Sequence, residues 1–538
     1  METISEMLLA RTGDPRPGLL AGEASWTWAE VIDESLARRD LASSLLGGGP
    51  PHICVLLDNV PEFCFWLGAT ALGGMVLVGG NSSHRGDELA RDISHTECQL
   101  LVTDLAHLPL VDGLHLGAGI GTVHTGNPRV LVVDSPGFDD LLRSSRTGST
   151  DPRPDITAST LGYLIFTSGT SGAPKAVRCS QGRMAFIGSA LVGMYSLVPE
   201  DVCYVAMPLF HSNALMAGWA PGLAAGAAIA LPSKGKFSAT GFLPDVRRYG
   251  VTYFNYVGKP LSYILATPEK PDDSDTTLRQ VFGNEGAARD IARFAERFGV
   301  PVTDGYGSTE GGAAMRRTPE TPFGSLGQGI NIIVVNQESG EECPRAQFDE
   351  KGALVNAADA IGEIVSTSGA AGFEGYWKNE EAESARIRRG WYWTGDLGYI
   401  DEAGYVFFAG RSDDWLRVDG ENFAAAPVAR ILERHPDVVL SAVYAVPDPV
   451  VGDQVMAALQ LKEDAAFDGE EFAEFLAGQP DLGTKWAPRY IRICPTLPTT
   501  ATSKILTRTL RSEGLESGDP VWQRETTLYR LYGGEDGN

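Results

Sequence analysis

Short apolar runs alternate with longer amphipathic segments early in the chain, and this alternation is the strongest constraint on its fold. Residues 52–58 (HICVLLD) favour a strand and residues 60–74 a helix. The pattern repeats with a strand at 75–81, a helix at 85–97 and a strand at 99–104. Such alternation predicts βα units on mainly parallel sheets.

From about residue 350 the sequence changes to short strands and turns. Residues 398–408 (GYIDEAGYVFF) place two aromatic, apolar runs around an acidic turn that contains glycine, which predicts a β-hairpin. A helix at 426–438, a strand at 439–448 and a helix at 469–479 follow. These elements indicate a second, compact unit near the end of the chain.

With 538 residues, the chain is longer than one hydrophobic core usually supports. We therefore predict an α/β protein with two domains. Residues 1–412 form a large N-terminal domain of mainly parallel βα sheets plus a β-barrel-like part, and residues 413–538 form a small, mobile α+β domain.

The overall charge limits the possible partners. Lys and Arg number 44 against 69 Asp and Glu, which gives a net charge of -25 and argues against binding to nucleic acid or to an anionic membrane.

The seven cysteines are scattered without a Cys-x-x-Cys pair, so we expect a reduced, cytoplasmic protein. Only residues 214–232 lack charge over the length of a bilayer, and Pro221 with many Ala and Gly favours a buried helix and strand there.

Residues 167–175 (TSGTSGAPK) have the composition of a phosphate-binding loop. Mobile glycines let backbone N–H groups approach an anion, hydroxyls add donors, and Lys175 supplies a positive charge. The apolar run at 161–166 predicts a strand that leads directly into this loop. We expect a nucleoside triphosphate to contact its donors, which are Thr167, Ser168, Gly169, Thr170, Ser171, Gly172 and Lys175.

Two common nucleotide motifs do not fit. The P-loop of kinases and GTPases needs four residues between its glycines and a Gly-Lys-Ser/Thr ending, whereas only two residues separate Gly169 from Gly172. Residues 304–312 (DGYGSTEGG) resemble a dinucleotide fingerprint, but Glu310 stands where the third glycine belongs. Both an ordinary P-loop enzyme and a Rossmann dehydrogenase are therefore disfavoured.

Five blocks of sequence together resemble the acyl-CoA synthetase/adenylate-forming superfamily, in the order and spacing of that family over nearly the whole chain. The blocks are FTSGTSGAPKAV, GYGSTEGG (305–312), WYWTGDLGYID (391–401), GRSDDWLRVDGEN (410–422) and LPTTATSKILTRTL (497–510). Within this superfamily, the local sequence of the chain most resembles that of the fatty-acid transport, very-long-chain and steroid side-chain CoA ligases.

The resemblance implies a reaction with ATP and Mg²⁺ in which a carboxylic acid becomes an acyl-AMP, pyrophosphate is released, and coenzyme A accepts the acyl group. Because an anion attacks a polyanion, electrostatic stabilisation must dominate. Glu310 and Thr167 are the expected ligands of Mg²⁺, since this hard cation prefers oxygen. By similarity, Thr309 donates to the α-phosphate and Lys175 is a mobile cation at the β- and γ-phosphates.

The resemblance also assigns the nucleoside. Tyr306, followed by Gly307, is expected to lie against adenine, and the 282–286 segment with Gly283, Asn284 and Glu285 is expected to line the adenine pocket. Asp396 resembles the carboxylate that accepts both ribose hydroxyls, with Arg411 as its partner on the sugar. A salt bridge between Asp396 and Arg411 is the structural alternative.

In the C-terminal unit, Lys504 resembles the catalytic lysine that spans the substrate carboxylate and the α-phosphate. Asp413 matches the hinge about which the family's small domain rotates after adenylation, and Gly420 would then flank the pantetheine tunnel, where a side chain would obstruct the thiol. These assignments make Lys504 and the hinge the two moving parts of the expected mechanism.

The acid itself is less constrained. His211, in residues 208–215 (PLFHSNAL), lies where the family often has a gate residue beside the acyl pocket, and a core histidine is the alternative. We expect a hydrophobic acid and CoA. A nitrite-activating diazotase that acts on an aryl amine and an inactive nucleotide-binding regulator stay open as alternatives, and a homodimer is possible.

Overall fold

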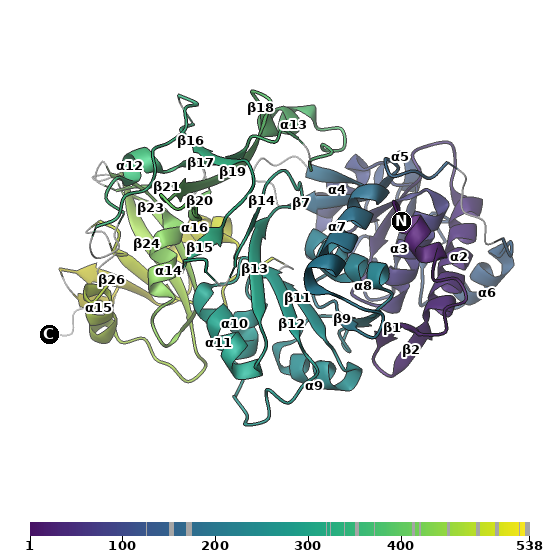
Figure 1. Cartoon of the computed structure of the whole chain (residues 1–538), viewed down its shortest axis with the longest axis horizontal. Coiled ribbons are helices and arrows are strands. Elements are labelled where there is room, and N and C mark those ends of the chain that lie inside the picture. The colour runs from purple at the N-terminus through teal and green to yellow at the C-terminus, as the bar shows by residue number, and fades with distance from the viewer. Residues whose placement is uncertain are drawn as a thin grey trace.

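In the residues that it describes, the computed structural model contains four β-sheets with helices packed between and around them (Figure 1). It describes residues 1–124, 126–149, 155–167, 175–318, 320–322, 324–337, 339–349, 354–370, 372–411, 415–418, 421–448, 452–479, 482, 485–500, 505–526 and 528–532.

A six-stranded sheet contains the predicted early βα units, on the right in Figure 1. Its strand order is β6-β5-β3-β4-β7-β8, parallel except for the β7–β8 pair. The strands are β3 (His52–Leu56), β4 (Val76–Gly79), β5 (Leu100–Thr103), β6 (Val130–Val132), β7 (Leu161–Thr167) and β8 (Lys175–Ser180). Both faces are covered: Ile53 and Val55 contribute to one apolar core, while Cys54 and Leu56 contribute to another. A strand buried on both faces explains why residues 53–57 are continuously apolar.

An eight-stranded sheet runs from the centre of the molecule to its lower right in Figure 1, with the order β14-β13-β12-β11-β9-β10-β1-β2. Only its edge strands β2 and β14 are antiparallel to their neighbours. The strands are β1 (Pro17–Ala21), β2 (Ala24–Thr27), β9 (Val202–Tyr204), β10 (Ala228–Leu231), β11 (Tyr253–Val257), β12 (Gln280–Asn284), β13 (Val302–Gly307) and β14 (Ala314–Arg316). Side chains of this sheet, such as Ile229 and Phe254, share one core with Ile53 and Val55 of the first sheet. The two sheets therefore belong to a single domain.

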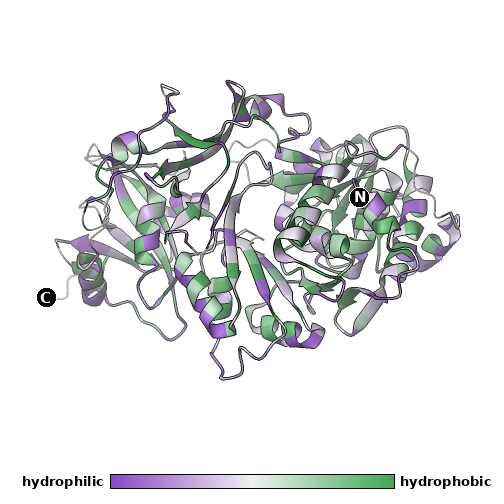
Figure 2. Ribbon diagram, in the orientation of Figure 1, coloured by the Kyte–Doolittle hydropathy of each residue, from purple (hydrophilic) through white to green (hydrophobic). Residues whose placement is uncertain are grey.

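Helices fill the space between these sheets and cover their outer faces. Hydrophobic residues, green in Figure 2, are frequent on the strands, and strands and helices both contribute to the large apolar core. The helices are α1 (Ile4–Leu9), α2 (Trp28–Leu45), α3 (Pro61–Gly73), α4 (Gly86–His95), η1 (Leu108–Leu110), α5 (Gly117–Ile120), α6 (Phe138–Ser145), α7 (Gln181–Tyr195), η2 (Ala214–Trp219), α8 (Ala220–Ala225), α9 (Ala239–Tyr249), α10 (Pro260–Leu265) and α11 (Ala288–Phe298). Helix α5 lies in a glycine-rich segment whose sequence did not indicate a helix.

Residues 214–232 form buried structure, as their composition predicts. The π-helix η2, the helix α8 and the strand β10 follow one another there, and all four residues of β10 are buried. Within the residues that the structure describes, no helix has both the length and the apolar character needed to cross a membrane.

The segment in which the sequence changes to short strands and turns forms an antiparallel sheet, although this sheet begins earlier than residue 350. Its strand order is β15-β20-β19-β17-β16, and β18 pairs with β19. The strands are β15 (Ser325–Gly327), β16 (Ile332–Val335), β17 (Gly362–Ser366), β18 (Ile387–Arg388), β19 (Trp391–Ile400) and β20 (Val406–Arg411), with helices α12 (Ala357–Ala360) and α13 (Glu380–Arg386). The predicted hairpin is the β19–β20 pair.

The last sheet forms the smaller unit on the left in Figure 1, with β23 pairing β24 beside the order β22-β21-β24-β25-β26-β27. Its elements are β21 (Trp415–Val418), β22 (Glu421–Ala424), α14 (Ala425–Leu432), β23 (Val438–Asp448), β24 (Gly452–Leu461), α15 (Gly469–Ala477), β25 (Tyr490–Ile493), α16 (Thr507–Glu513), η3 (Gly514–Glu516), β26 (Val521–Glu525) and β27 (Leu528–Leu531). The helix predicted for 426–438 ends at Leu432; turns and a bend occupy 433–437, and Val438 already begins β23. The boundary near residue 412 stays a prediction, because residues 412–414 are outside the described ranges.

Candidate active site

The ends of the predicted phosphate loop lie opposite each other on adjacent strands. Thr167 ends β7, Lys175 begins β8, and the two residues are direct partners in this antiparallel ladder. Partners of this kind project from the same face of a sheet. Residues 168–174, which include the predicted Ser168, Gly169, Thr170, Ser171 and Gly172, are outside the described ranges. The hydroxyl and the ammonium that flank the loop therefore start from one place at the edge of the sheet.

The loop that follows β13 is held by contacts from two other segments. Ser212 Oγ and Thr309 Oγ1 lie 2.7 Å apart, and Arg183 of α7 donates to the Thr309 carbonyl at 2.6 Å. His211 is half-buried immediately before Ser212, and its ring lies against Phe210. The structure thus brings the predicted gate segment next to the residue expected at the α-phosphate.

Glu310 is buried, with 6% of its surface exposed, and its carboxylate has a defined donor. The Tyr376 hydroxyl donates to Glu310 Oε1 at 2.8 Å. Burial, and after it the charge of Glu310, raises the pKa of Tyr376, so the phenol keeps its proton at neutral pH. A carboxylate here is not a freely solvated loop side chain.

The two residues assigned to adenine and ribose are in contact. The Tyr306 hydroxyl donates to Asp396 Oδ2, and Asp396 is the register partner of Arg411 in the β19–β20 hairpin. Gly307 ends β13 and pairs with Ala314. The structure therefore brings Tyr306, Asp396 and the backbone of Arg411 to one place, as a nucleoside site requires.

The segment expected at adenine has close backbone packing. A Cβ atom on Gly283 would lie 2.2 Å from the Tyr256 ring, so only glycine fits between β11 and β12. The side-chain N–H of Asn284 donates to the Gly305 carbonyl at 2.8 Å, which fixes this amide to β13. Glu285 has a φ of 63°, a backbone conformation that costs free energy in a residue other than glycine and that clusters at functional sites.

The residues expected to move during the reaction lie outside the part of the chain that the structure describes. Lys504, the hinge residue Asp413 and Gly420 are outside the described ranges, and their roles stay predictions. The residues that border the lysine segment are described: Thr499 and Ile505 form an isolated β-bridge, and Ile505 packs on the cluster that includes Leu497 and Leu510. Tyr263 of α10 packs on the same cluster, so this face of the small unit is directed toward the large domain.

The sequence matches the AMP-binding enzyme family over residues 10–377 and the AMP-binding enzyme C-terminal domain over residues 428–504. This chain belongs to the AMP-binding enzymes. The predicted superfamily is thereby confirmed. The two matches, one to the main family and one to its C-terminal domain, agree with the five sequence blocks that suggested this superfamily.

Curated relatives cover almost the whole of this AMP-binding enzyme. It is 51% identical to a steroid-22-oyl-CoA synthetase from Rhodococcus jostii (strain RHA1), over 97% of this chain and 93% of the relative. It is 47% identical to a medium/long-chain-fatty-acid–CoA ligase, FadD17, from Mycobacterium marinum, over 97% of this chain and 98% of the relative. The predictions of an AMP-forming acyl-CoA synthetase and of ATP, Mg²⁺ and CoA as its small molecules are confirmed at the level of the family. These relatives lend no support to the diazotase or to the inactive regulator.

Solved structures confirm the fold class. ATP-bound MatB from Rhodopseudomonas palustris aligns with a TM-score of 0.79 at 22% identity, over 94% of this chain and 98% of that structure. A benzoate CoA ligase from Burkholderia xenovorans LB400 gives 0.79 at 20% identity, over 95% and 100%. At such identities the likeness concerns the α/β architecture alone.

The residues present fit a bound Mg²⁺. A carboxylate has about four lone-pair directions, and Tyr376 takes one of them at Glu310, so oxygen sites are left for a hard cation. No group of three His, Cys, Asp or Glu side chains suited to a metal occurs among the described residues. One carboxylate plus a hydroxyl and substrate phosphates is the usual arrangement for this ion. Thr167 and Glu310 would hold it, and the ion would neutralise phosphate charge.

Three contacts at this site were not predicted from the sequence. Ser212, Arg183 and Tyr376 each bond Thr309 or Glu310, yet they stand 66 to 126 residues away along the chain. None of the three residues carries a signal in the sequence that links it to Thr309 or Glu310.

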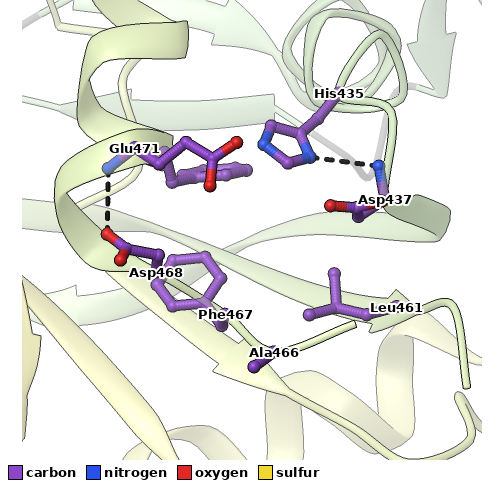
Figure 3. Close-up of a pocket in the computed structure, with 8 residues that line it drawn as sticks. His435, Asp437, Leu461, Ala466, Phe467, Asp468 and Glu471 are labelled. Carbon is purple, nitrogen blue, oxygen red and sulfur yellow. Dashed lines mark hydrogen bonds between the residues drawn. The ribbon is translucent and has the colours of Figure 1, made fainter. Parts of the chain in front are cut away.

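A cavity in the small unit is unrelated to the nucleotide site (Figure 3). It is lined by His435, Asp437, Leu461, Ala466, Phe467, Asp468, Glu471 and Phe472. His435 Nδ1 accepts from the Asp437 N–H, and Asp468 caps the start of α15 by accepting from the Glu471 N–H. Its volume of about 10 Å³ is barely enough for one water molecule, so it cannot bind a substrate.

Proposed function

We propose that this enzyme converts a bulky hydrophobic carboxylic acid of the steroid side-chain type to its CoA thioester by way of an acyl-AMP. The carboxylate attacks the α-phosphorus of ATP and pyrophosphate leaves. The thiol of CoA then attacks the acyl carbon and AMP leaves. The observation that carries the choice of acid is the 51% identity to a steroid-22-oyl-CoA synthetase over 97% of the chain.

The contacts around Thr309 support the first step. Thr309 is expected to donate to the α-phosphate, and its contact with Ser212 supports an acid site that starts beside it. Residues 214–219 then form a buried π-helix, and single π turns are frequent at functional sites. We propose that the acid extends from Ser212 along this helix, with its carboxylate toward Thr309.

The charges of the site would be balanced by residues from separate segments. Lys175 is the proposed partner of the β- and γ-phosphates, while Glu310 and Thr167 would hold Mg²⁺. In this proposal the domain boundary at 412–413 and Asp413 allow the small domain to present Lys504 for adenylation and Gly420 for thioester formation. A cytoplasmic location, the absence of nucleic-acid binding and a possible homodimer stay part of the proposal.

The test compares two acids in one assay. The purified protein is incubated with ATP, Mg²⁺ and CoA, and with either a steroid acid that carries its carboxyl at carbon 22 or a saturated medium- or long-chain fatty acid. AMP release gives kcat/KM for each acid. We expect the steroid acid to be favoured by about tenfold or more, a ratio that an apolar pocket can supply. Preference for the fatty acid would contradict the choice of acid and favour the medium- and long-chain activity named for the 47% relatives.

A further inference from the structure

The Tyr376 hydroxyl connects the predicted magnesium carboxylate to the strand that begins with Lys175. Tyr376 and Glu310 are buried, at 3% and 6% exposure, and they are joined by the 2.8 Å hydrogen bond to Glu310 Oε1. A buried carboxylate that accepts from a fixed phenol has a restricted orientation, because a second orientation would leave the phenol without its acceptor.

The backbone around Tyr376 is added to β8 as a short extra strand. Tyr376 forms a β-bridge with Val177, Arg178 N–H donates to the Gly375 carbonyl at 3.0 Å, and Trp377 N–H donates to the Ala176 carbonyl at 2.8 Å. These bonds start one residue after Lys175. The position of the Tyr376 backbone relative to that of Lys175 is therefore set by main-chain pairing.

The same segment is held at its other end by Glu374. Its carboxylate accepts from the Ser180 N–H and from Ser180 Oγ, both at 2.6 Å. Ser180 is the last residue of β8 and caps α7, the helix whose Arg183 bonds the Thr309 carbonyl. The extra strand is thus tied at both ends of β8.

Arg386 connects Tyr376 to the strand of the ribose carboxylate. Its Nε lies 3.4 Å from the Tyr376 oxygen, and its Nη1 donates to the carbonyls of Trp393 and Thr394. Thr394 is two residues before Asp396 on β19. One phenol thus stands among the strand of Lys175, the strand of Asp396 and the carboxylate of Glu310.

We propose that Tyr376 is a positioning residue for Mg²⁺: its hydroxyl occupies Oε1 of Glu310 and orients the carboxylate so that its remaining lone pairs are directed at the metal. Tyr376 does not touch metal or substrate. Partners of this kind behind a metal ligand typically contribute 10- to 100-fold to metal affinity. The inference rests on the ATP and Mg²⁺ chemistry of the family and not on the identity of the acid.

The test variant is Tyr376→Phe, which removes one oxygen and keeps the ring. We expect the apparent KM for Mg²⁺ in acid-dependent AMP formation to rise about tenfold. Independently of activity, Mn²⁺ binding in the presence of a non-hydrolysable ATP analogue, followed by electron paramagnetic resonance, should weaken by a similar factor. This second measurement needs no acid, so a wrong choice of acid leaves it valid.

Tyr204→Phe is the matched control. Tyr204 is as buried as Tyr376 and its hydroxyl also donates to a carboxylate, Asp245, at 2.8 Å, within the same domain. It should lose comparable stability without a change in Mg²⁺ or Mn²⁺ dependence. Equal metal dependence of Tyr376→Phe and the wild type would overturn the proposal, as would an equal loss of metal affinity in Tyr204→Phe.

A double variant separates positioning from a general structural role. If Tyr376 acts through Glu310, Tyr376→Phe should weaken Mn²⁺ binding much less in a Glu310→Ala background than in the wild type. Full additivity of the two losses would contradict the proposal.

Arg386→Lys removes the guanidinium beside the phenol and should raise the KM for Mg²⁺, as Tyr376→Phe should. This variant serves as the test if Tyr376→Phe does not fold, and an unchanged KM would then count against the proposal.

Discussion

Lys259 Nζ lies 2.7 Å from Glu433 Oε1, and this ion pair joins the large domain to the small one. Lys259 precedes α10 and Glu433 follows α14. Arg289 of α11 adds bonds to the carbonyls of Glu433 and His435, where it caps the end of α14. Both partners of the ion pair are about four-fifths buried, so solvent screens the pair only in part. The observed arrangement of the domains thus has specific polar contacts of its own.

Removal of this ion pair should be measurable as a coupling energy. Lys259→Met and Glu433→Gln should each destabilise the protein, and the double variant should lose less than the sum by about 1 to 2 kcal/mol, because the first change already removes the partner of the second. Urea unfolding of the four proteins measures the cycle. Additive losses would show that the pair contributes nothing to stability.

The stability should depend on pH through His107. Its Nδ1 lies 2.6 Å from Asp104 and its Nε2 lies 3.4 Å from Asp58. Hydrogen bonds to Asp104 and then to Asp58 raise the pKa of His107 from 6.5 to about 9. Because the folded-state pKa is raised, this contribution is complete below pH 6.5 and is lost as the pH rises through 9. The free energy of unfolding should fall across this window in the wild type, and His107→Gln should lack that component. An identical slope in both proteins would contradict the assignment.

ATP affinity should weaken on acidification through Asp304. This buried carboxylate accepts from the Gly286 N–H at 2.9 Å and lies 3.1 Å from Arg317, so it holds the segment expected at adenine. Burial raises the pKa of Asp304 to about 6. Protonation as the pH falls through 6 removes the charge that faces Arg317. The KM for ATP should therefore rise between pH 7 and pH 5, while Asp304→Asn should show a raised KM that no longer changes over this range. A wild-type KM that is constant from pH 7 to pH 5 is the contrary result.

The stability of the protein should depend on the side-chain amide of Asn59. Its amide nitrogen donates to the carbonyls of Val205 and Met207, and its oxygen accepts from the Leu209 N–H, so it holds the segment that leads to His211. Asn59→Asp would direct an oxygen at two carbonyls, with an expected cost of about 2 to 4 kcal/mol. Thermal unfolding measures it. Asn331→Asp, at an exposed site, is the control and should change stability by no more than about 0.5 kcal/mol. Equal effects of the two changes would contradict the role of Asn59.

Local sequence patterns were sufficient for most of the fold. The runs at 52–58, 75–81 and 99–104 became β3, β4 and β5, because each is apolar on both faces and each is followed by a helical segment or a turn. Helix α5 and the end of α14 were missed, since short helices and helix ends depend on tertiary contacts more than on composition.

The site was predictable only where its residues are contiguous. The neighbours Thr309 and Glu310, and the Asp396 block, could be read from motifs, and the structure places them near one another through Tyr306. Tyr376, Ser212 and Arg183 could not be connected to that site, because their contacts follow from how separate sheets pack. Such pairs have no signature in a single sequence.

The central claim is that a lysine from the small domain neutralises the charge that builds up where the carboxylate meets the α-phosphate. The direct measurement is acid-dependent AMP formation by Lys504→Ala, with binding of an ATP analogue measured in parallel. We expect AMP formation to fall by about 100-fold or more, as for the loss of one preorganised electrostatic donor, while nucleotide binding stays close to that of the wild type. AMP formation at the wild-type rate by Lys504→Ala would contradict the account.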